Sequence, residues 1–247
     1  MFYYFGRKKQ TAKHYPKPIY DKIIEPFAGS AAYSLLGSNW EKEIFLIEKD
    51  KRVADIWHWL IGEATPEKIS ALPDLTVGEK STEFLHIIHA VTKMAFAYKT
   101  IKATPVLIRN WEISKRHMAE NLHKVKHWKI VCGDYSSAPA EEATWFIDPP
   151  YQNQGKLGYA WSAAMLDYTE LARWVKSRKG QVICCEGGEA NYLPFRPLVI
   201  NKGVAGRQSK ELLYYKVCGD VEERGIQAQL RDHDSARQAD HVEDRPL

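Results

Sequence analysis

The chain has 247 residues, and its 45% hydrophobic and 27% charged residues are ordinary proportions for a globular protein with a sizeable core. These proportions exclude a disordered chain, a disulfide-stapled miniprotein and a collagen-like fibre. The net charge is +4, but residues 221–247 are acidic on balance and residues 1–220 carry +7, so an anionic partner is permitted and not demanded.

The N-terminal sequence lacks the apolar stretch of a signal peptide, and no run of about 18 apolar residues occurs in the chain. We therefore expect a cytoplasmic protein with no membrane partner. The cysteines show no CxxC spacing, and we interpret them as reduced core thiols and not as metal ligands. They are Cys132, Cys184, Cys185 and Cys218.

Residues 22–62 alternate between apolar runs and helical spacing. The pattern predicts a strand at 22–25, a helix at 31–36, a second strand at 44–47 and a second helix at 50–61. This order is the βαβ unit of a parallel, doubly wound sheet.

Residues 65–126 show helical stripes without strand alternation, which predicts a helical insertion. The α/β pattern then resumes, with strands at 129–132, 144–147 and 181–185, a helix at 166–179, and a final antiparallel pair at 198–200 and 212–217. Residues 221–247 carry few aliphatic and many charged side chains, which is typical of a flexible tail. The chain is thus predicted to hold one α/β domain, over 1–64 and 127–220, interrupted by the insertion.

The first motif is Glu25-Pro-Phe-Ala-Gly-Ser30, between the first strand and the predicted helix. Gly29 would let a ligand approach the backbone, and the helix would present free N–H groups. The motif is not GxGxxG and lacks the lysine of a P-loop, which disfavours a nicotinamide dinucleotide or a nucleoside triphosphate. The alternative is a Gly-Ser turn that only starts a helix.

Glu48 lies at the carboxyl end of the second strand, 19 residues after Gly29. An acid about 20 residues beyond a glycine turn is well placed to bind the hydroxyls of a ribose. Two alternatives stay open: Glu48 is an exposed loop charge, or Asp50 is the ligand instead.

The second motif is Asp148-Pro-Pro-Tyr151, which follows an apolar strand. The strand delivers one carboxylate to the sheet edge, and two prolines without N–H groups leave their carbonyls as acceptors. Asp148 and the Pro149 carbonyl could accept both hydrogens of an exocyclic amino group, with Tyr151 stacked on the ring that bears it. The alternative is a rigid loop with a capping aspartate.

Together the two motifs resemble those of the Dam-like DNA adenine-N6 methyltransferases, which use S-adenosylmethionine (AdoMet), in the alpha order of motifs. Tyr4-Phe-Gly-Arg-Lys8 resembles that family's N-terminal element, which helps to close the cofactor site. Gly133-Asp134-Tyr135 resembles its acidic motif next to the cofactor adenine, and the stretch from Arg207 to Tyr215 resembles its closing strand.

The resemblance implies a Rossmann-like AdoMet-dependent methyltransferase sheet with a helical target-recognition insertion at 65–126. It also implies methyl transfer to the N6 amino group of adenine in a specific DNA sequence, by base flipping and direct in-line transfer, without a metal. The implied catalytic residues are Asp148, Pro149, Pro150 and Tyr151. The implied cofactor-binding residues are Tyr4, Lys8, Glu25, Pro26, Phe27, Ala28, Gly29, Ser30, Glu48, Asp134 and Asp148. A bacterial or phage setting with a partner restriction endonuclease is possible for this family.

The DNA substrate is expected to contact basic side chains of the insertion and its surroundings. The candidates are Lys9, Arg109, Lys115, Arg116 and Arg207. The alternative is that these side chains bind no DNA and form a solvated basic helix face, or, for Lys8 and Lys9, a charged N-terminal arm.

Three departures from the family pattern bear on these expectations. Glu48 stands in Glu-Lys-Asp where the family often shows Asp-x-Asn, the strand at 182–185 runs into Glu186-Gly-Gly, and the insertion has no recognisable target-reading signature. The same fold acting on RNA adenine or cytosine-N4 is one alternative, and a nucleic-acid-binding relative without turnover is another. Asp at position 148 favours adenine, and the retained motifs argue against lost turnover.

Overall fold

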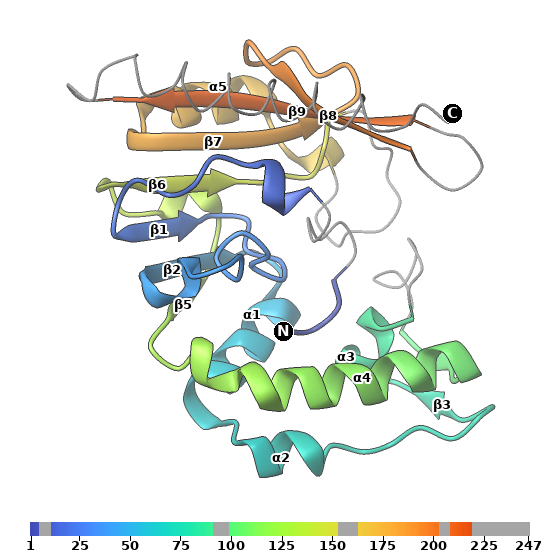
Figure 1. Cartoon of the computed structure of the whole chain (residues 1–247). Helices are drawn as coiled ribbons and strands as arrows, with labels where there is room; N and C mark the ends of the chain where they lie inside the picture. The colour runs from blue at the N-terminus through green and yellow to red at the C-terminus, as the bar shows by residue number, and fades with distance from the viewer. Residues whose placement is uncertain (5–10, 91–98, 153–162, 203–207, 219–247) are drawn as a thin grey trace, which may run out of the picture.

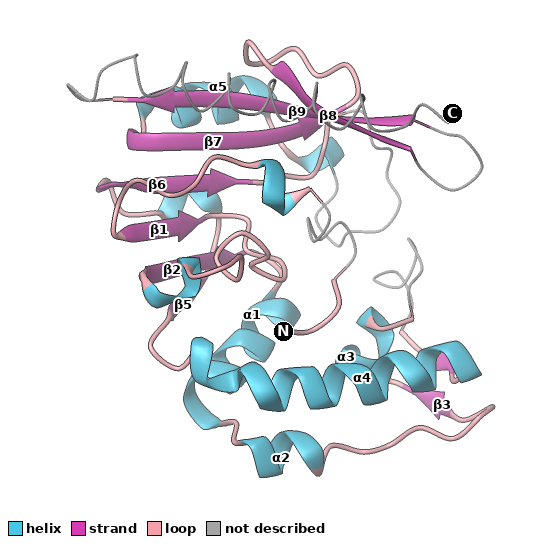
Figure 2. Cartoon of the chain, viewed as in Figure 1, coloured by secondary structure: helices cyan, strands magenta, loops and turns pink. Residues whose placement is uncertain are grey.

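The structure is a computed structural model that describes residues 1–4, 11–90, 99–152, 163–202 and 208–218 (Figure 1). Lys8, Lys9, Arg207 and the tail over 221–247 lie outside the described residues, so their predicted roles stay predictions. The described part is a mixed α/β fold, compatible with a Rossmann-like sheet, with the helical insertion beside it (Figure 2).

The central sheet has seven strands, and every strand predicted from the sequence is confirmed. They are β1 (Lys22–Glu25), β2 (Glu43–Glu48), β5 (Lys129–Cys132), β6 (Glu142–Ile147), β7 (Lys179–Gly187), β8 (Arg196–Lys202) and β9 (Gln208–Val217). Their order is β5-β2-β1-β6-β7-β9-β8; β9 is antiparallel to both β7 and β8, and the other neighbouring strands are parallel. The predicted final antiparallel pair is therefore β8 with β9.

This strand order contains a topological switch point beside β1. The chain first builds outward on one side, from β1 to β2 and then β5, and afterwards returns to place β6 on the other side of β1. Ligands of open α/β sheets bind in the crevice at the carboxyl ends of the strands at such a point. The fold thus marks the carboxyl ends of β1 and β6 as the place to look for a site.

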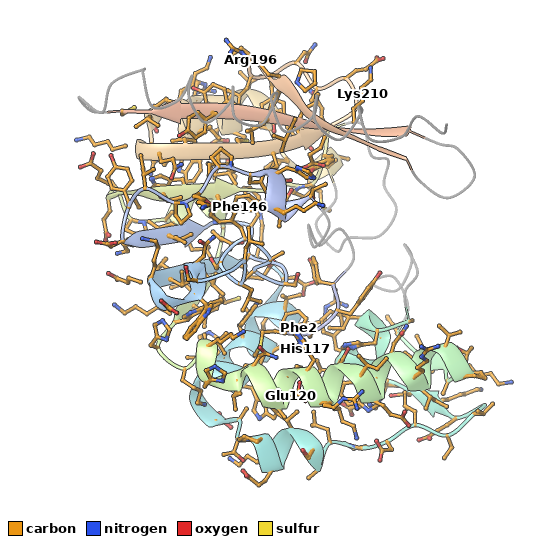
Figure 3. All side chains as sticks on the ribbon, in the orientation of Figure 1. Phe2, His117, Glu120, Phe146, Arg196 and Lys210 are labelled. Carbon is orange, nitrogen blue, oxygen red and sulfur yellow. The ribbon has the colours of Figure 1, made fainter. Side chains whose placement is uncertain are left out.

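The strands pack their alternate side chains into two hydrophobic cores, one on each face of the sheet. Phe146 belongs to one face, which is covered by α1 (Lys51–His58), its π-helical extension Trp59–Glu63, and the N-terminal segment with Phe2 (Figure 3). Trp145 belongs to the other face, which is covered by α5 (Tyr168–Ser177). The helices predicted at 50–61 and 166–179 begin at Lys51 and Tyr168, because Asp50 and Asp167 cap their first backbone N–H groups.

The helix predicted at 31–36 is wrong, since those residues form irregular turns. Ala31 has φ +48°, a left-handed conformation that interrupts a right-handed helix. The Ser34 N–H donates to the buried Glu25 carboxylate at 2.8 Å, and not to the carbonyl four residues back as in a helix. The first motif therefore has no helix N-terminus to offer to a phosphate.

The insertion is mainly helical, but the expectation that it lacks strands is wrong. Its elements are α2 (Pro66–Ser70), β3 (Lys80–Ser81), α3 (Phe84–Ile88), β4 (Ile101–Lys102) and α4 (Pro105–Asn121), with β3 and β4 paired antiparallel. Trp111 of α4 packs in the same core cluster as Trp57 of α1, so the insertion shares the core of one sheet face. Short 3-10 turns complete the described elements, at Ala12–His14, Asn39–Glu41, Leu122–Lys124, Tyr135–Ser137 and Ala163–Met165.

None of the helices in the described part of the chain is long and apolar enough to cross a membrane. All four cysteines carry free thiols, as predicted, but only Cys184 and Cys185 are core residues. Cys132 is exposed and Cys218 half-buried, because β5 is an edge strand and Cys218 lies just past β9.

Candidate functional site

The two sequence motifs meet at the switch point of the sheet. β1 and β6 are parallel neighbours, with Ile23 paired to Thr144 and Ile24 to Trp145. Glu25 ends β1, and Asp148 follows the last residue of β6, so the two motif loops leave the same edge side by side (Figure 1). The structure thereby brings together residues that lie about 120 positions apart in the chain.

The loop after β1 is fixed by the ends of β2 and α1. Gly29 has φ +48°, a conformation that favours glycine, and its N–H donates to Glu48 Oε2 at 2.9 Å. Its carbonyl accepts from the Trp57 indole at 2.8 Å. A Cβ atom on Gly29 would lie 3.0 Å from the Tyr4 ring, so the N-terminal segment passes close to this glycine.

Glu48 is buried, which makes the exposed-charge interpretation wrong. Its second oxygen accepts from the Asp50 N–H at 2.8 Å, and burial raises the pKa of Glu48 to about 7. Asp50 instead caps α1 and forms an ion pair with Arg52 at 2.6 Å. Asp50 is therefore committed to the helix, and Glu48 is the acid that faces the first motif.

Asp134 lies just after β5, near the first motif. Its carboxylate accepts from the Ser136 N–H at 3.0 Å and pairs with the Lys49 ammonium at 2.8 Å. Burial alone would raise its pKa, but these two partners hold it below its ordinary value. The ring of the next residue, Tyr135, stacks on Phe27 with 5.4 Å between ring centroids, which joins the acidic motif to the first motif.

The loop after β6 is held at three successive residues by three different elements. The Pro150 carbonyl accepts from the Tyr168 hydroxyl of α5 at 2.6 Å. The Tyr151 hydroxyl donates to Glu211 of β9 at 2.7 Å, and the Gln152 N–H donates to Glu186 of β7 at 3.1 Å. We call Tyr168, Glu186 and Glu211 the loop-holding residues.

Buried carboxyl groups gather at this sheet edge. Burial, together with the nearby charge of the half-buried Asp148, raises the pKa of Glu25 to about 8 and that of Glu186 to about 7. Within the described ranges, no lysine, arginine or histidine forms an ion pair with Glu25, Glu48 or Glu186. A cation would lower the pKa of these groups and favour their ionised form, so such a site favours a cationic ligand over a phosphate.

Of the predicted DNA contacts on α4, Arg109 and Arg116 have exposed side chains. Lys115 does not share that face. Its side chain is 11% exposed, and its ammonium contacts the Leu72 carbonyl at 3.1 Å and the Asp74 carboxylate. Lys115 thus fastens α4 to the segment after α2, which disfavours its predicted contact with DNA.

The loop-holding residues were assigned no role from the sequence. Glu186 carried a usable signal, since it follows an apolar strand whose carboxyl end reaches the same edge as Asp148. Glu211 and Tyr168 carried none, because their positions depend on the antiparallel direction of β9 and on the packing of α5.

The sequence was compared with protein-family models and with curated proteins, and neither comparison finds a match. A functional assignment therefore depends on the geometry and chemistry of the site.

Proposed function

We propose that this protein is an AdoMet-dependent DNA methyltransferase that methylates the N6 amino group of adenine. The observation that carries the proposal is the meeting of the two motif loops at the switch point, where β1 and β6 lie side by side. A cofactor-binding loop and an acceptor-binding loop must lie together for direct transfer between their ligands.

The residues of the first loop fit the cofactor. AdoMet carries a positive sulfonium and a positive ammonium group, and the edge that receives it holds the buried Glu25, Glu48 and Glu186. The absence of a helix N-terminus after the first motif likewise favours a cation over a nucleotide phosphate. Gly29 would admit the cofactor to the backbone, Glu48 would bind the ribose on release from the Gly29 N–H, and Asp134 lies beside the Phe27–Tyr135 pair, where the adenine is expected.

The second loop supplies the chemistry at the acceptor. AdoMet, when bound, supplies a methyl group that its positive sulfur already activates. The amino lone pair of adenine is delocalised into the ring, so the amino group is a poor nucleophile. Asp148 and the Pro149 carbonyl accept its two hydrogens, favour a pyramidal nitrogen and stabilise positive charge as it forms. The Pro150 carbonyl is already bound to Tyr168, which stiffens the loop in this role.

The substrate adenine must leave the duplex to reach Asp148, and it would stack on Tyr151 after displacing the groups that now bury that ring, which is 8% exposed. Arg109 and Arg116 on the exposed face of α4 would contact phosphates, or a guanine edge in the groove, and hold the duplex against the insertion.

The test is transfer of labelled methyl from AdoMet to undermethylated duplex DNA, followed by mass analysis of the nucleosides, with Asp148→Ala as the matched control. We expect N6-methyladenine with the wild-type chain and none with the variant. Detection of N4-methylcytosine, or of label in RNA alone, would show that the substrate is cytosine or RNA and not adenine in DNA. Absence of both transfer and AdoMet binding would favour a nucleic-acid-binding protein without turnover.

A further inference from the structure

Tyr151 is held by one cross-strand pair of residues at the end of the sheet. Gly187 of β7 and Glu211 of β9 are directly paired in the antiparallel ladder, and both touch the side chain of Tyr151. Lys210, the neighbour of Glu211, marks this place in Figure 3. The pair lies two (β7) and three (β9) strands away from β1, on the far side of the second motif.

Gly187 provides bare backbone at the Cδ2–Cε2 edge of the Tyr151 ring. A Cβ atom on Gly187 would lie 2.6 Å from Cδ2 and 2.8 Å from Cε2 of Tyr151, closer than real Cβ contacts come. The ring therefore occupies the space that any other residue at 187 would fill, and glycine is required here by close approach.

Glu211 fixes the far end of the same ring. Its Oε1 accepts from the Tyr151 hydroxyl at 2.7 Å and from the Tyr15 hydroxyl at 2.5 Å. Burial, followed by the charges of Asp148 and Glu211, raises the pKa of Tyr151 well above its ordinary value, so the hydroxyl stays a donor. Tyr15 in turn packs its ring on Phe146 of β6 with 5.1 Å between centroids, which anchors Glu211 to the strand that carries Asp148.

We propose that Gly187 and Glu211 are positioning residues that set the ring plane of Tyr151, and thereby the plane in which the acceptor base stacks beside Asp148. The proposal rests on the proposed function, because it concerns the base-binding half of the same site. A tyrosine ring has two side-chain torsions, and contact with Gly187 at its Cδ2–Cε2 edge and with Glu211 at its hydroxyl restrains both. A base stacked on a fixed ring presents its amino group to Asp148 in one orientation, which is what direct transfer requires.

A double-mutant cycle tests whether Glu211 acts through Tyr151. Tyr151→Phe keeps the ring and removes its hydroxyl, and Glu211→Leu removes the acceptor. We expect each to lower kcat about 10-fold, the equivalent of one charge-assisted hydrogen bond, with the KM for AdoMet unchanged. The double variant should be no slower than either single variant. The proposal would be overturned if the two kcat losses multiply in the double variant, or if Glu211→Leu keeps kcat within twofold of wild type.

Two further variants make the result independent of folding defects. Glu211→Gln keeps an acceptor oxygen and should retain kcat within about threefold of wild type. Gly187→Ala should lower kcat without weakening AdoMet binding, because its methyl group displaces the ring. The matched control is Tyr20→Phe, which removes another tyrosine–glutamate hydrogen bond, to Glu142 at 3.0 Å, from the opposite end of β6 and should leave kcat unchanged. A Gly187→Ala enzyme as fast as Tyr20→Phe would contradict the proposal.

Amide hydrogen exchange separates failure of this inference from failure of the proposed function, since it needs no substrate. Glu211→Leu should speed exchange at Tyr151 and Gln152 by about tenfold or more, whereas Tyr20→Phe should not. Unchanged exchange would overturn the positioning role. A wild-type chain that transfers no methyl would contradict the proposed function, whatever the exchange result.

Discussion

The two loops at the sheet edge are held by different parts of the chain. The loop after β1 is held by Ser34 and by Glu48 and Trp57, from the next strand and helix along the chain. The loop after β6 is held by Tyr168, and also by Glu186 and Glu211, which lie 34 and 60 positions from the residues that they bind. The first loop therefore takes its shape from the elements that directly follow it, whereas the second takes its shape from the whole closing part of the sheet.

The largest effect is expected from a variant of the second loop that should lose methyl transfer and keep AdoMet binding. Asp148→Ala should abolish methyl transfer, because no other group on that loop supplies the carboxylate, and should leave AdoMet affinity within a few fold. Turnover is measured by label transfer and affinity by equilibrium titration. Turnover comparable to wild type in this variant would contradict the assignment of Asp148.

Gly29→Val makes the complementary change in the first loop. The variant must place a β-branched residue at φ +48° and a Cβ atom 3.0 Å from the Tyr4 ring, so we expect AdoMet binding to weaken by at least about tenfold. The unfolding free energy should fall by about 1–3 kcal/mol. Gly62→Val, at a glycine whose Cβ would meet nothing within 4 Å, is the control for substitution of a glycine. A folded Gly29→Val variant that binds AdoMet normally would remove this loop from the cofactor site.

The free energy of unfolding should fall as pH rises between the ordinary pKa of the buried acids and their raised pKa in the folded protein. Glu25 has an ordinary value of 4.5 and a folded pKa of about 8, so between these values the folded state binds more protons than the unfolded state. The unfolding free energy then decreases with pH, by at most about 1.4 kcal/mol per pH unit for one group. Glu25→Gln keeps an acceptor for Ser34 and should remove one group's share of this slope. Denaturant titrations between pH 5 and 8 give both slopes, and identical slopes would contradict the burial argument.

The smallest effect distinguishes two neighbours on α4. Arg116→Gln should lower the salt dependence of DNA binding by about one phosphate contact, because its side chain is exposed. Lys115→Gln should leave that slope unchanged and lower stability slightly, because Lys115 is bound to Leu72 and Asp74. Binding titrations over a series of salt concentrations compare the two variants. If both variants keep the wild-type salt dependence of DNA binding, α4 does not face the DNA.

The local character of the first loop explains how much of the site could be predicted. Every strand of the central sheet, the helices near 50–61 and 166–179, and the edge positions of Glu25, Glu48 and Asp148 follow from apolar runs, helical spacing and the residues that end them. The prediction of a helix at 31–36 is wrong because helical spacing does not reveal that Ala31 takes a left-handed conformation. Nor does it reveal that the Ser34 N–H donates to the Glu25 carboxylate.

The rest of the site depends on contacts between distant elements, which spacing along the chain does not encode. The register that pairs Gly187 with Glu211 arises from the antiparallel return of β9. Likewise, a lysine on a basic helix face reads as solvated from sequence alone, and only the packing of α4 shows that Lys115 is bound internally.

The central claim, that the edge shared by β1 and β6 receives a cationic cofactor, is tested most directly by calorimetric titration of AdoMet at pH 7 in two buffers of different ionisation enthalpy. A cation lowers the pKa of neighbouring carboxyl groups, so Glu25, Glu48 and Glu186 should release protons when AdoMet binds. S-adenosylhomocysteine, whose sulfur is neutral, should release fewer. No binding, or binding of AdoMet without proton release, would contradict the account.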